Sequence, residues 1–263
     1  MTTNPLLSKI QLPGETFQLP SQGIFYVNEE LAPDVVNGEV EIYPMNTYCE
    51  ILLNSPDKLL SGKAITQVFE ICVPQVLKPM QLLAKDLDFI LCCLRYTTFG
   101  NTMDIDFIHT CEQAKSHSYS INLQNIIKST QKFDPTSIET EYSVKLPNGQ
   151  NVLIKPMIYK DVLQFYDMTA SQKTNTKTDE ELEQMLLDMM TSLIQSVDNI
   201  TDPNLIFEWL KQLNLGWKKL IEKSITNVTE WGVNYNTVHT CKDCGEEMTI
   251  TITANPIDFF FQQ

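Results

Sequence analysis

Residues 239–253 read His-Thr-Cys-Lys-Asp-Cys-Gly-Glu-Glu-Met-Thr-Ile-Thr-Ile-Thr. Within this stretch Cys241 and Cys244 are separated by two residues, and Gly245 follows them directly. The spacing is typical of one half of a zinc ribbon, because a tight turn lets two thiolates face one cation and glycine permits the positive φ that aims backbone amides at sulfur. The alternation over 248–252 predicts a strand after the turn. A redox-active pair would need its first thiolate at a helix N-terminus, so the pattern favours a structural metal site.

A second turn of this kind begins with the same three residues, His109-Thr110-Cys111. It is incomplete, because Ala114 stands where the pattern would place another cysteine. A closed structural zinc site needs four ligands, and the two turns together would supply three thiolates. The missing ligand therefore has to come from another residue type.

A histidine is the natural fourth ligand, and the chain contains three of them. We expect His117 to complete the site, while His109 and His239 stay open as alternatives. Because those two occupy equivalent positions, we interpret them as sharing a structural role, such as a hydrogen bond that orients the turn. The sequence thus predicts one structural zinc ion and no other cofactor, with the alternative that the incomplete pair of turns binds no metal. The predicted metal ligands are Cys111, Cys241, Cys244 and His117.

Four short landmarks occur twice in the same order, which indicates a tandem duplication. They are 19–23 and 146–149, 40–45 and 152–157, 99–100 and 231–232, and 109–111 and 239–241. We therefore expect an α+β fold with two related tandem repeats, each a β-hairpin, a helical segment and a C-terminal zinc-ribbon-like cysteine-turn hairpin. The expected boundaries are an N-terminal segment 1–17, a first repeat 18–132, a second repeat 139–253 with a mobile surface insertion 168–178, and an apolar C-terminal tail 254–263. The two cysteine turns should lie close together.

Apolar spacing predicts the helices. Residues 65–72, 83–94, 182–197 and 205–213 each place their large apolar side chains on one helical face. The longest apolar run, 89–94, lies within the second of these segments. We expect these four segments to form most of the helical part of the fold.

Turn and cap signals place other elements. Pro147-Asn148-Gly149 lies between two β-prone runs and predicts a hairpin. Thr47 with Glu50, and Thr178 with Glu181, predict capping boxes at the starts of two helices.

Composition limits the partners. Among 263 residues, 33 are Asp or Glu and 19 are Lys or Arg, which gives a net charge of −14 and a pI near 4.6. So acidic a surface repels phosphate, which argues against nucleic acid and an anionic membrane as partners. No apolar run approaches the ~18 residues of a membrane span. The first residues lack a signal-peptide pattern, so we expect a cytoplasmic protein.

Cysteine usage and motif content narrow the function classes. Seven cysteines without a secretion signal argue against a disulfide framework. The sequence contains no phosphate-binding loop, no His-Glu-x-x-His, no Gly-x-Ser-x-Gly and no dinucleotide glycine pattern. We therefore predict no catalytic residues and a non-enzymatic role, with a zinc or thiol-redox enzyme as a remote alternative.

The apolar tail carries aromatic side chains that have to be buried somewhere, because exposed aromatic clusters are unfavourable. One interpretation is that they dock onto the protein's own core. The other is that they anchor a partner or a second copy of the chain. The predicted partner-binding residues are Ile257, Phe259, Phe260 and Phe261.

Several motifs together resemble the T4-like bacteriophage baseplate hub assembly proteins. They are Leu19-Pro20-Ser21-x-Gly23, Gly38-Glu39-Val-Glu-Ile-Tyr-Pro44-Met45, Pro56-Asp57-Lys58-Leu59-Leu60-x-Gly62-x-Ala64-Ile65, Leu94-Arg95-x-x-Thr98-x-Gly100, Ser118-Tyr119-x-Ile121-Asn122-Leu123 and Pro256-Ile257-Asp258-x-Phe260-Phe261. The resemblance spans nearly the whole chain and is clearest over 18–125.

This resemblance implies a non-enzymatic factor in phage tail morphogenesis that promotes baseplate hub assembly by binding hub subunits. It would act in the host cytoplasm during assembly and bind hub or other tail proteins. The alternative that it implies is a minor structural component of the hub, located in the virion tail baseplate. Self-association through the tail is a further candidate interaction.

Overall fold

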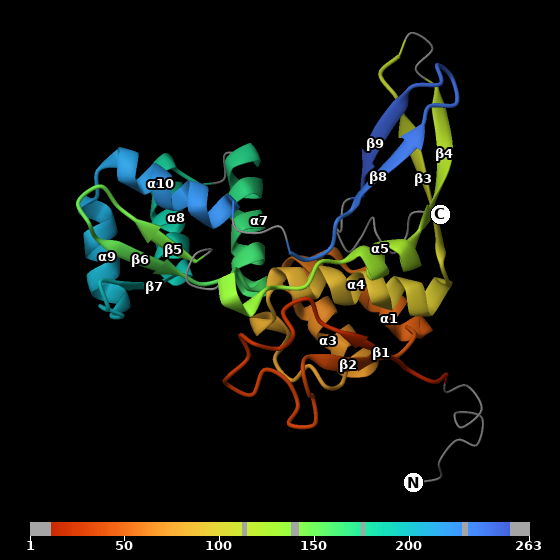
Figure 1. Ribbon diagram of the computed structural model, residues 1–263, viewed down its shortest axis with the longest axis horizontal. Coiled ribbons are helices and arrows are strands. Elements are labelled where there is room, and N and C mark those ends of the chain that lie inside the picture. The colour runs from red at the N-terminus through yellow and green to blue at the C-terminus, as the bar shows by residue number, and fades with distance from the viewer. Residues whose placement is uncertain (1–11, 112–114, 138–141, 175–176, 228–230, 253–263) are drawn as a thin grey trace. The chain divides into compact units, whose positions relative to one another are not determined.

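The computed structural model describes residues 12–111, 115–137, 142–174, 177–227 and 231–252 (Figure 1). The chain divides into two compact units. The first contains residues up to Pro79, residues 85–132 and the chain from Trp231 onward, and the second contains 80–84 and 133–230. Each unit is described by itself below.

The first unit combines helices with three two-stranded antiparallel sheets. Its elements are β1 (Glu15–Gln18), β2 (Glu39–Ile42), α1 (Thr47–Leu53), α2 (Pro56–Leu60), α3 (Lys63–Cys72), α4 (Ala84–Phe99), β3 (Thr102–Ile108), β4 (Ser116–Asn122), α5 (Leu123–Ser129), β8 (Asn236–Thr240) and β9 (Glu247–Thr251). A short 3-10 turn, η2 (Pro79–Gln81), precedes α4.

Helix α4 is the most deeply buried helix of the first unit. Its apolar residues from Leu87 to Leu94 are buried on nearly every side, which is typical of a helix at the centre of a core rather than at its surface. The helix predicted over 83–94, which contains the apolar run 89–94, is therefore confirmed as α4. It ends at Phe99, and the following Gly100 has a φ of +90°, the left-handed conformation that commonly terminates helices.

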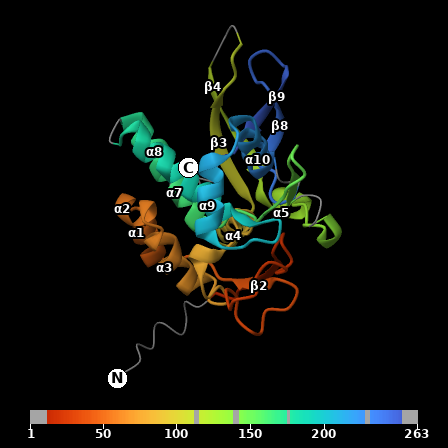
Figure 2. The same ribbon diagram turned by 90° about the vertical axis from the view of Figure 1, so that its left-hand side faces the viewer.

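Two hairpins stand side by side in the first unit. Strands β3 and β4 pair from Thr102 opposite Asn122 to Ile108 opposite Ser116. Strands β8 and β9 pair from Asn236 opposite Thr251 to Thr240 opposite Glu247. Figure 2 gives a second view of the two hairpins, turned by a quarter. Both are short and present one half-buried face, so neither has a large core of its own.

The second unit packs helices on a three-stranded antiparallel sheet with the order β5-β6-β7. Its elements are η3 (Pro135–Ser137), β5 (Ser143–Lys145), β6 (Asn151–Ile154), α7 (Tyr159–Thr174), α8 (Asp179–Leu193), β7 (Ile194–Val197), α9 (Pro203–Gln212) and α10 (Leu215–Asn227). Twelve buried apolar residues from the sheet, α8, α9 and α10 form its core. The predicted hairpin around Pro147-Asn148-Gly149 is confirmed as the β5–β6 pair.

The observed helix starts confirm one predicted cap and correct another. Thr178 and Glu181 form the predicted capping box at the start of α8. At α1 the N-cap is Asn46, whose side chain accepts the Cys49 N–H, and not Thr47. Asparagine is among the strongest N-cap residues, which explains why the helix begins one residue earlier than the threonine pattern predicts.

Two further differences concern the second unit. The segment 168–178, expected as a loop, continues α7 as far as Thr174. Its alanine, glutamine and lysine residues have good helix propensity, so polar composition alone misidentified it. The helical spacing predicted to Val197 ends at Leu193, and Ile194–Val197 instead pairs with β6 as strand β7. Ile194 and Val197 are β-branched residues, which favour this extended pairing.

Helices and small antiparallel sheets in one chain confirm the α+β class. A related descent of the two sequence halves stays a prediction. Each half begins with an antiparallel strand pair, β1–β2 in the first half and β5–β6 in the second. Each half also has a later hairpin next to its His-Thr-Cys triplet: the first triplet follows β3 directly, and β8 contains the first two residues of the second triplet. The compact units cut across the halves, since residues from Trp231 onward belong to the first unit. Within the described residues, no helix combines the length and apolar character that crossing a membrane requires.

Candidate metal centre

The turn between β8 and β9 is shaped by its own backbone. The Cys241 N–H donates to the carbonyl of Glu246 (2.8 Å), and the Gly245 N–H donates to the carbonyl of Cys241 (3.0 Å). Gly245 has a φ of +78°, the left-handed conformation that the sequence predicts for this glycine. These bonds hold Cys241 and Cys244 at the two ends of one tight turn.

The end of β3 supplies a second pair of side chains. Strand β3 ends at Ile108, and the Cys111 N–H then donates to the carbonyl of His109 at 2.9 Å. A hydrogen bond between residues two apart closes a very tight turn. His109 and Cys111 therefore leave the strand together, at the end of the hairpin that lies beside β8 and β9.

These four side chains form one cluster within the first unit. The ligand atoms of His109, Cys111, Cys241 and Cys244 all lie within 4.8 Å of one another. The Cys244 Sγ is 3.4 Å from the Nδ1 of His109. A tetrahedral zinc ion with standard bond lengths holds its sulfur and nitrogen ligand atoms about 3.6–3.8 Å apart. The cluster therefore has the dimensions of a tetrahedral site that is slightly relaxed.

The donor set agrees with this geometry. Three thiols and one imidazole match the Cys₃His composition of structural zinc sites. Thiolate ligands favour zinc and other soft ions over magnesium and calcium, which prefer oxygen. Cys241 is buried, His109 and Cys111 are half-buried, and Cys244 is exposed. The residues present thus fit a zinc ion held at the edge of the hairpins.

Hydrogen bonds stabilise the ionised form of one cysteine of the cluster, Cys241. The backbone N–H of Cys244 stabilises the thiolate of Cys241 and, with further donors from Asp243, Cys244 and His109, lowers the pKa of Cys241 to about 6. The backbone N–H of Glu246 favours the thiolate of Cys244, yet desolvation and the neighbouring sulfurs of Cys241 and Cys111 leave the pKa of Cys244 raised. Three thiols packed together repel one another once ionised, and a bound cation removes that repulsion.

The hairpins pack on each other beside the cluster. Tyr119, Cys241, Met248 and Ile250 form a small buried core, with Phe107 and Cys111 against it. Lys242, inside the cysteine turn, donates its backbone N–H to the Tyr119 hydroxyl at 3.3 Å and its ammonium group to the Ser118 carbonyl. The same ammonium lies 4.9 Å from the centroid of the Tyr119 ring. Strand β4 and the cysteine turn are thereby tied together.

The structure brings three of the four predicted ligands together and places the fourth elsewhere. Cys111, Cys241 and Cys244 are in the cluster, and His109 joins them. The Nε2 of His117 lies instead 2.9 Å from the Oδ1 of Asp243, whose pKa this histidine lowers. His117 therefore orients the cysteine turn through Asp243 rather than facing the three sulfurs.

The two equivalent histidines have different surroundings. His109 faces the thiols, whereas the Nε2 of His239 lies 3.1 Å from the Thr237 hydroxyl and its ring packs edge-on against Tyr119 at 5.6 Å. His109 is the member of the cluster that the sequence analysis did not choose as a ligand. Its position two residues before Cys111, directly after a strand, is the sequence signal that could have identified it. The predicted partner-binding residues Ile257, Phe259, Phe260 and Phe261 lie outside the described residues.

The sequence was compared with known proteins, solved structures and protein families. Comparison with curated proteins and with solved structures finds no match. Residues 39–261 match the family model described as T4 bacteriophage base plate protein, which covers most of the sequence. The matched range contains both hairpins and all four members of the cluster. The chain therefore belongs to the T4 bacteriophage base plate protein family.

Proposed function

We propose that this protein promotes assembly of the baseplate hub by binding hub subunits in the host cytoplasm. The observation that carries the proposal is membership of the base plate family over residues 39–261. Membership in this family implies association with other phage tail proteins, and the resemblance to hub assembly proteins narrows the partner to the hub. The family also favours a structural, non-enzymatic role.

The charge of the chain supports a binding role of this kind. A net charge of −14 suits a protein that covers basic faces of unassembled subunits and releases them later. Charged surfaces chiefly tune the rates of encounter and exchange, which is what a transient assembly factor requires.

A second candidate is a minor structural component of the hub in the finished virion. The family description favours it, because it refers to the base plate itself. The two candidates differ in where the protein is found after assembly. An assembly factor binds hub subunits and is absent from finished particles, whereas a structural component has a fixed copy number in them.

Two measurements on infected cells separate these candidates. Affinity purification of the tagged full chain should recover hub subunits, and quantitative mass spectrometry of purified virions should then show whether the chain remains. Recovery of hub subunits without the protein in virions supports an assembly factor, and a constant copy number supports the structural component. If no tail protein is recovered and the virions lack the chain, both candidates are wrong.

For the cysteine cluster, we propose a structural zinc ion bound by His109, Cys111, Cys241 and Cys244. Bound there, zinc would join the end of β3 to the β8–β9 turn and hold the two hairpins together. X-ray absorption at the zinc edge of the purified protein tests this assignment. We expect about three sulfur neighbours near 2.3 Å and one nitrogen near 2.0 Å. A shell of oxygen and nitrogen only would contradict it.

A further inference from the structure

A second feature of the first unit lies in its most acidic segment. Residues 10–57 contain eight Asp or Glu and no Lys, Arg or His. The segment includes the long connection between β1 and β2, residues 19–38. This connection carries no positive charge of its own, and Glu29 and Asp34 on it are exposed whereas Glu30 is buried.

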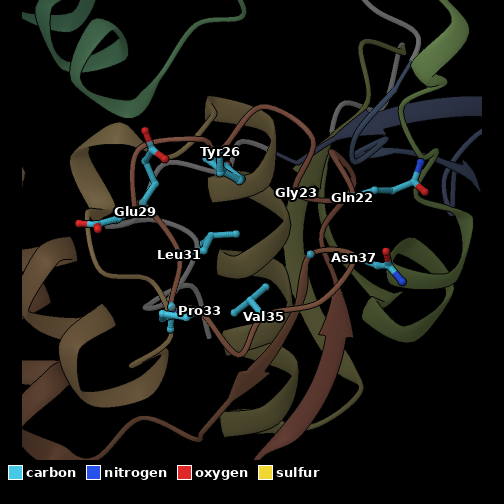
Figure 3. A pocket seen from close by; sticks show the side chains of 11 residues that line it. Gln22, Gly23, Tyr26, Glu29, Leu31, Pro33, Val35 and Asn37 are labelled. Carbon is cyan, nitrogen blue, oxygen red and sulfur yellow. The ribbon is translucent and has the colours of Figure 1, made fainter.

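The connection encloses a pocket of ≈180 Å³ (Figure 3). Its walls include the apolar side chains of Leu31 and Val35 together with the ring of Tyr26, and the two acidic residues Glu29 and Glu30 also belong to its lining. Pockets that bind whole small molecules are larger, about 300–1,000 Å³. The dimensions suit a single long side chain.

Glu30 is a buried acidic residue in the lining of the pocket. It exposes only 9% of its surface. One oxygen, Oε2, accepts the backbone N–H of Asn28 at 2.7 Å, and among the described residues no cation lies within ion-pair distance of the carboxylate. The neighbouring Lys78 donates its ammonium group to the Asn28 carbonyl instead. A buried carboxylate without a counter-ion is unfavourable unless a cation arrives.

The pocket is built before any ligand arrives. The Leu19 N–H donates to the Gly38 carbonyl at 2.9 Å, which closes the connection at its base. The buried carboxylate of Asp86 on α4 accepts the Ser21 N–H at 3.0 Å and the Tyr26 hydroxyl at 2.6 Å. Such internal hydrogen bonds lower the ordering entropy that a binding loop would otherwise lose.

We propose that this pocket binds one lysine or arginine side chain of a partner protein. The aliphatic stem would lie along Leu31 and Val35 while the charged head reaches the carboxylates of Glu29 and Glu30. The proposal deepens the proposed function, on which it rests for the kind of partner: a basic face of a tail protein. A guanidinium or ammonium group there gives Glu30 the counter-ion that no described residue provides at ion-pair distance.

Peptide titration of the full chain tests the pocket directly. The ¹⁵N-labelled protein is titrated with acetyl-Gly-Arg-Gly-amide or acetyl-Gly-Lys-Gly-amide, and amide shifts are followed by NMR. We expect saturable shifts in residues 22–38 with a Kd on the order of 1–10 mM, because only one side chain of the peptide enters the pocket. The matched peptide with norleucine keeps the stem and lacks the charge, and should not saturate.

Two variants locate the recognition. Glu30→Gln keeps the oxygen that accepts the Asn28 N–H and removes the charge, so we expect binding to weaken about tenfold. Glu50→Gln, on an exposed position of α1, removes the same charge away from the pocket and should change Kd by less than about twofold. Absence of saturable shifts, equal binding of the norleucine peptide, or an unchanged Kd in Glu30→Gln would each overturn the proposal. Because the titration uses no hub subunit, its failure is distinguishable from failure of the hub-binding proposal.

Discussion

Replacing Cys244 with alanine separates a metal ligand from an ordinary surface cysteine. Cys244 is exposed, and substitutions at exposed positions usually change the free energy of unfolding by no more than about 0.5 kcal/mol. A structural zinc site contributes an apparent binding free energy of about 10–16 kcal/mol. Divided evenly over four ligands, this is about 2.5–4 kcal/mol for Cys244. The two interpretations therefore differ at least fivefold in the expected effect.

The loss should appear in the hairpins that the cluster joins. Their shared core has only four buried residues, and an isolated two-stranded hairpin is marginally stable. The second unit has its own core of twelve buried residues and contains none of the four cluster residues. Native-state hydrogen exchange resolves this, because it reports the opening free energy of each amide. We expect amides of β8 and β9 in Cys244→Ala to lose about 2.5–4 kcal/mol of protection, with those of β6 unchanged.

A matched variant controls for the substitution itself. Thr240 is an exposed residue of β8 next to Cys241, and Thr240→Ala should alter protection by less than about 0.5 kcal/mol. If Cys244→Ala behaves like Thr240→Ala in protein purified without chelator, the cluster does not hold the hairpins through a metal. Equal losses in the hairpins and in β6 would also refute the reasoning, since they would indicate global unfolding.

Three further predictions concern stability. Burial raises the pKa of Asp86 to about 6 despite hydrogen bonds from Ser21 and Tyr26. Folding therefore favours the protonated carboxyl, so Asp86 should lower the free energy of unfolding by about 3 kcal/mol as the pH rises from about 4 to about 6, and Asp86→Asn should make this decline with pH shallower by that amount in urea titrations. Asn46→Ala should lower the melting temperature through loss of about 1 kcal/mol of capping, more than Thr47→Ala, and the reverse order would contradict the observed cap. Met190→Ala, in the core of the second unit, should cost about 2–5 kcal/mol in urea unfolding, and a loss below about 1 kcal/mol would place this residue outside the core.

Local chemistry made the hairpins and several helices predictable from the sequence. The turn residues Pro147-Asn148-Gly149 and the glycine at 245 demand particular backbone conformations, and both turns have the form predicted. The capping box at Thr178 is confirmed for the same reason, since both partners lie within one helical turn. These signals are short-range and need no knowledge of the rest of the fold.

Long-range contacts explain what the sequence did not reveal. Strand β7 exists because residues after α8 pair with β6, and a spacing pattern cannot show a partner forty residues away. The ammonium group of Lys85 donates to the carbonyl of Trp231, one of the contacts that places the chain from Trp231 onward in the first unit. Neither contact can be predicted from the local composition or periodicity of the sequence.

The three cysteines of the candidate site were predictable from the sequence, whereas its histidine was not. Cysteine spacing identified Cys241 and Cys244, and the repeated His-Thr-Cys triplet added Cys111. The choice among histidines depends on which side chain faces the sulfurs after the β3 turn, a turn that the hydrogen bond from the Cys111 N–H to the His109 carbonyl helps to shape. His117, on the neighbouring strand, is held by Asp243 instead.

The zinc content of four purified proteins, the wild type and three variants, tests the central claim, that His109 and three cysteines hold one zinc ion between the hairpins. Wild type and His117→Ala, prepared without chelator, should each carry about one zinc per chain, and His109→Ala should carry far less. Wild-type protein with no more zinc than Cys244→Ala would contradict the claim. So would a His109→Ala variant that retains its zinc while His117→Ala loses it.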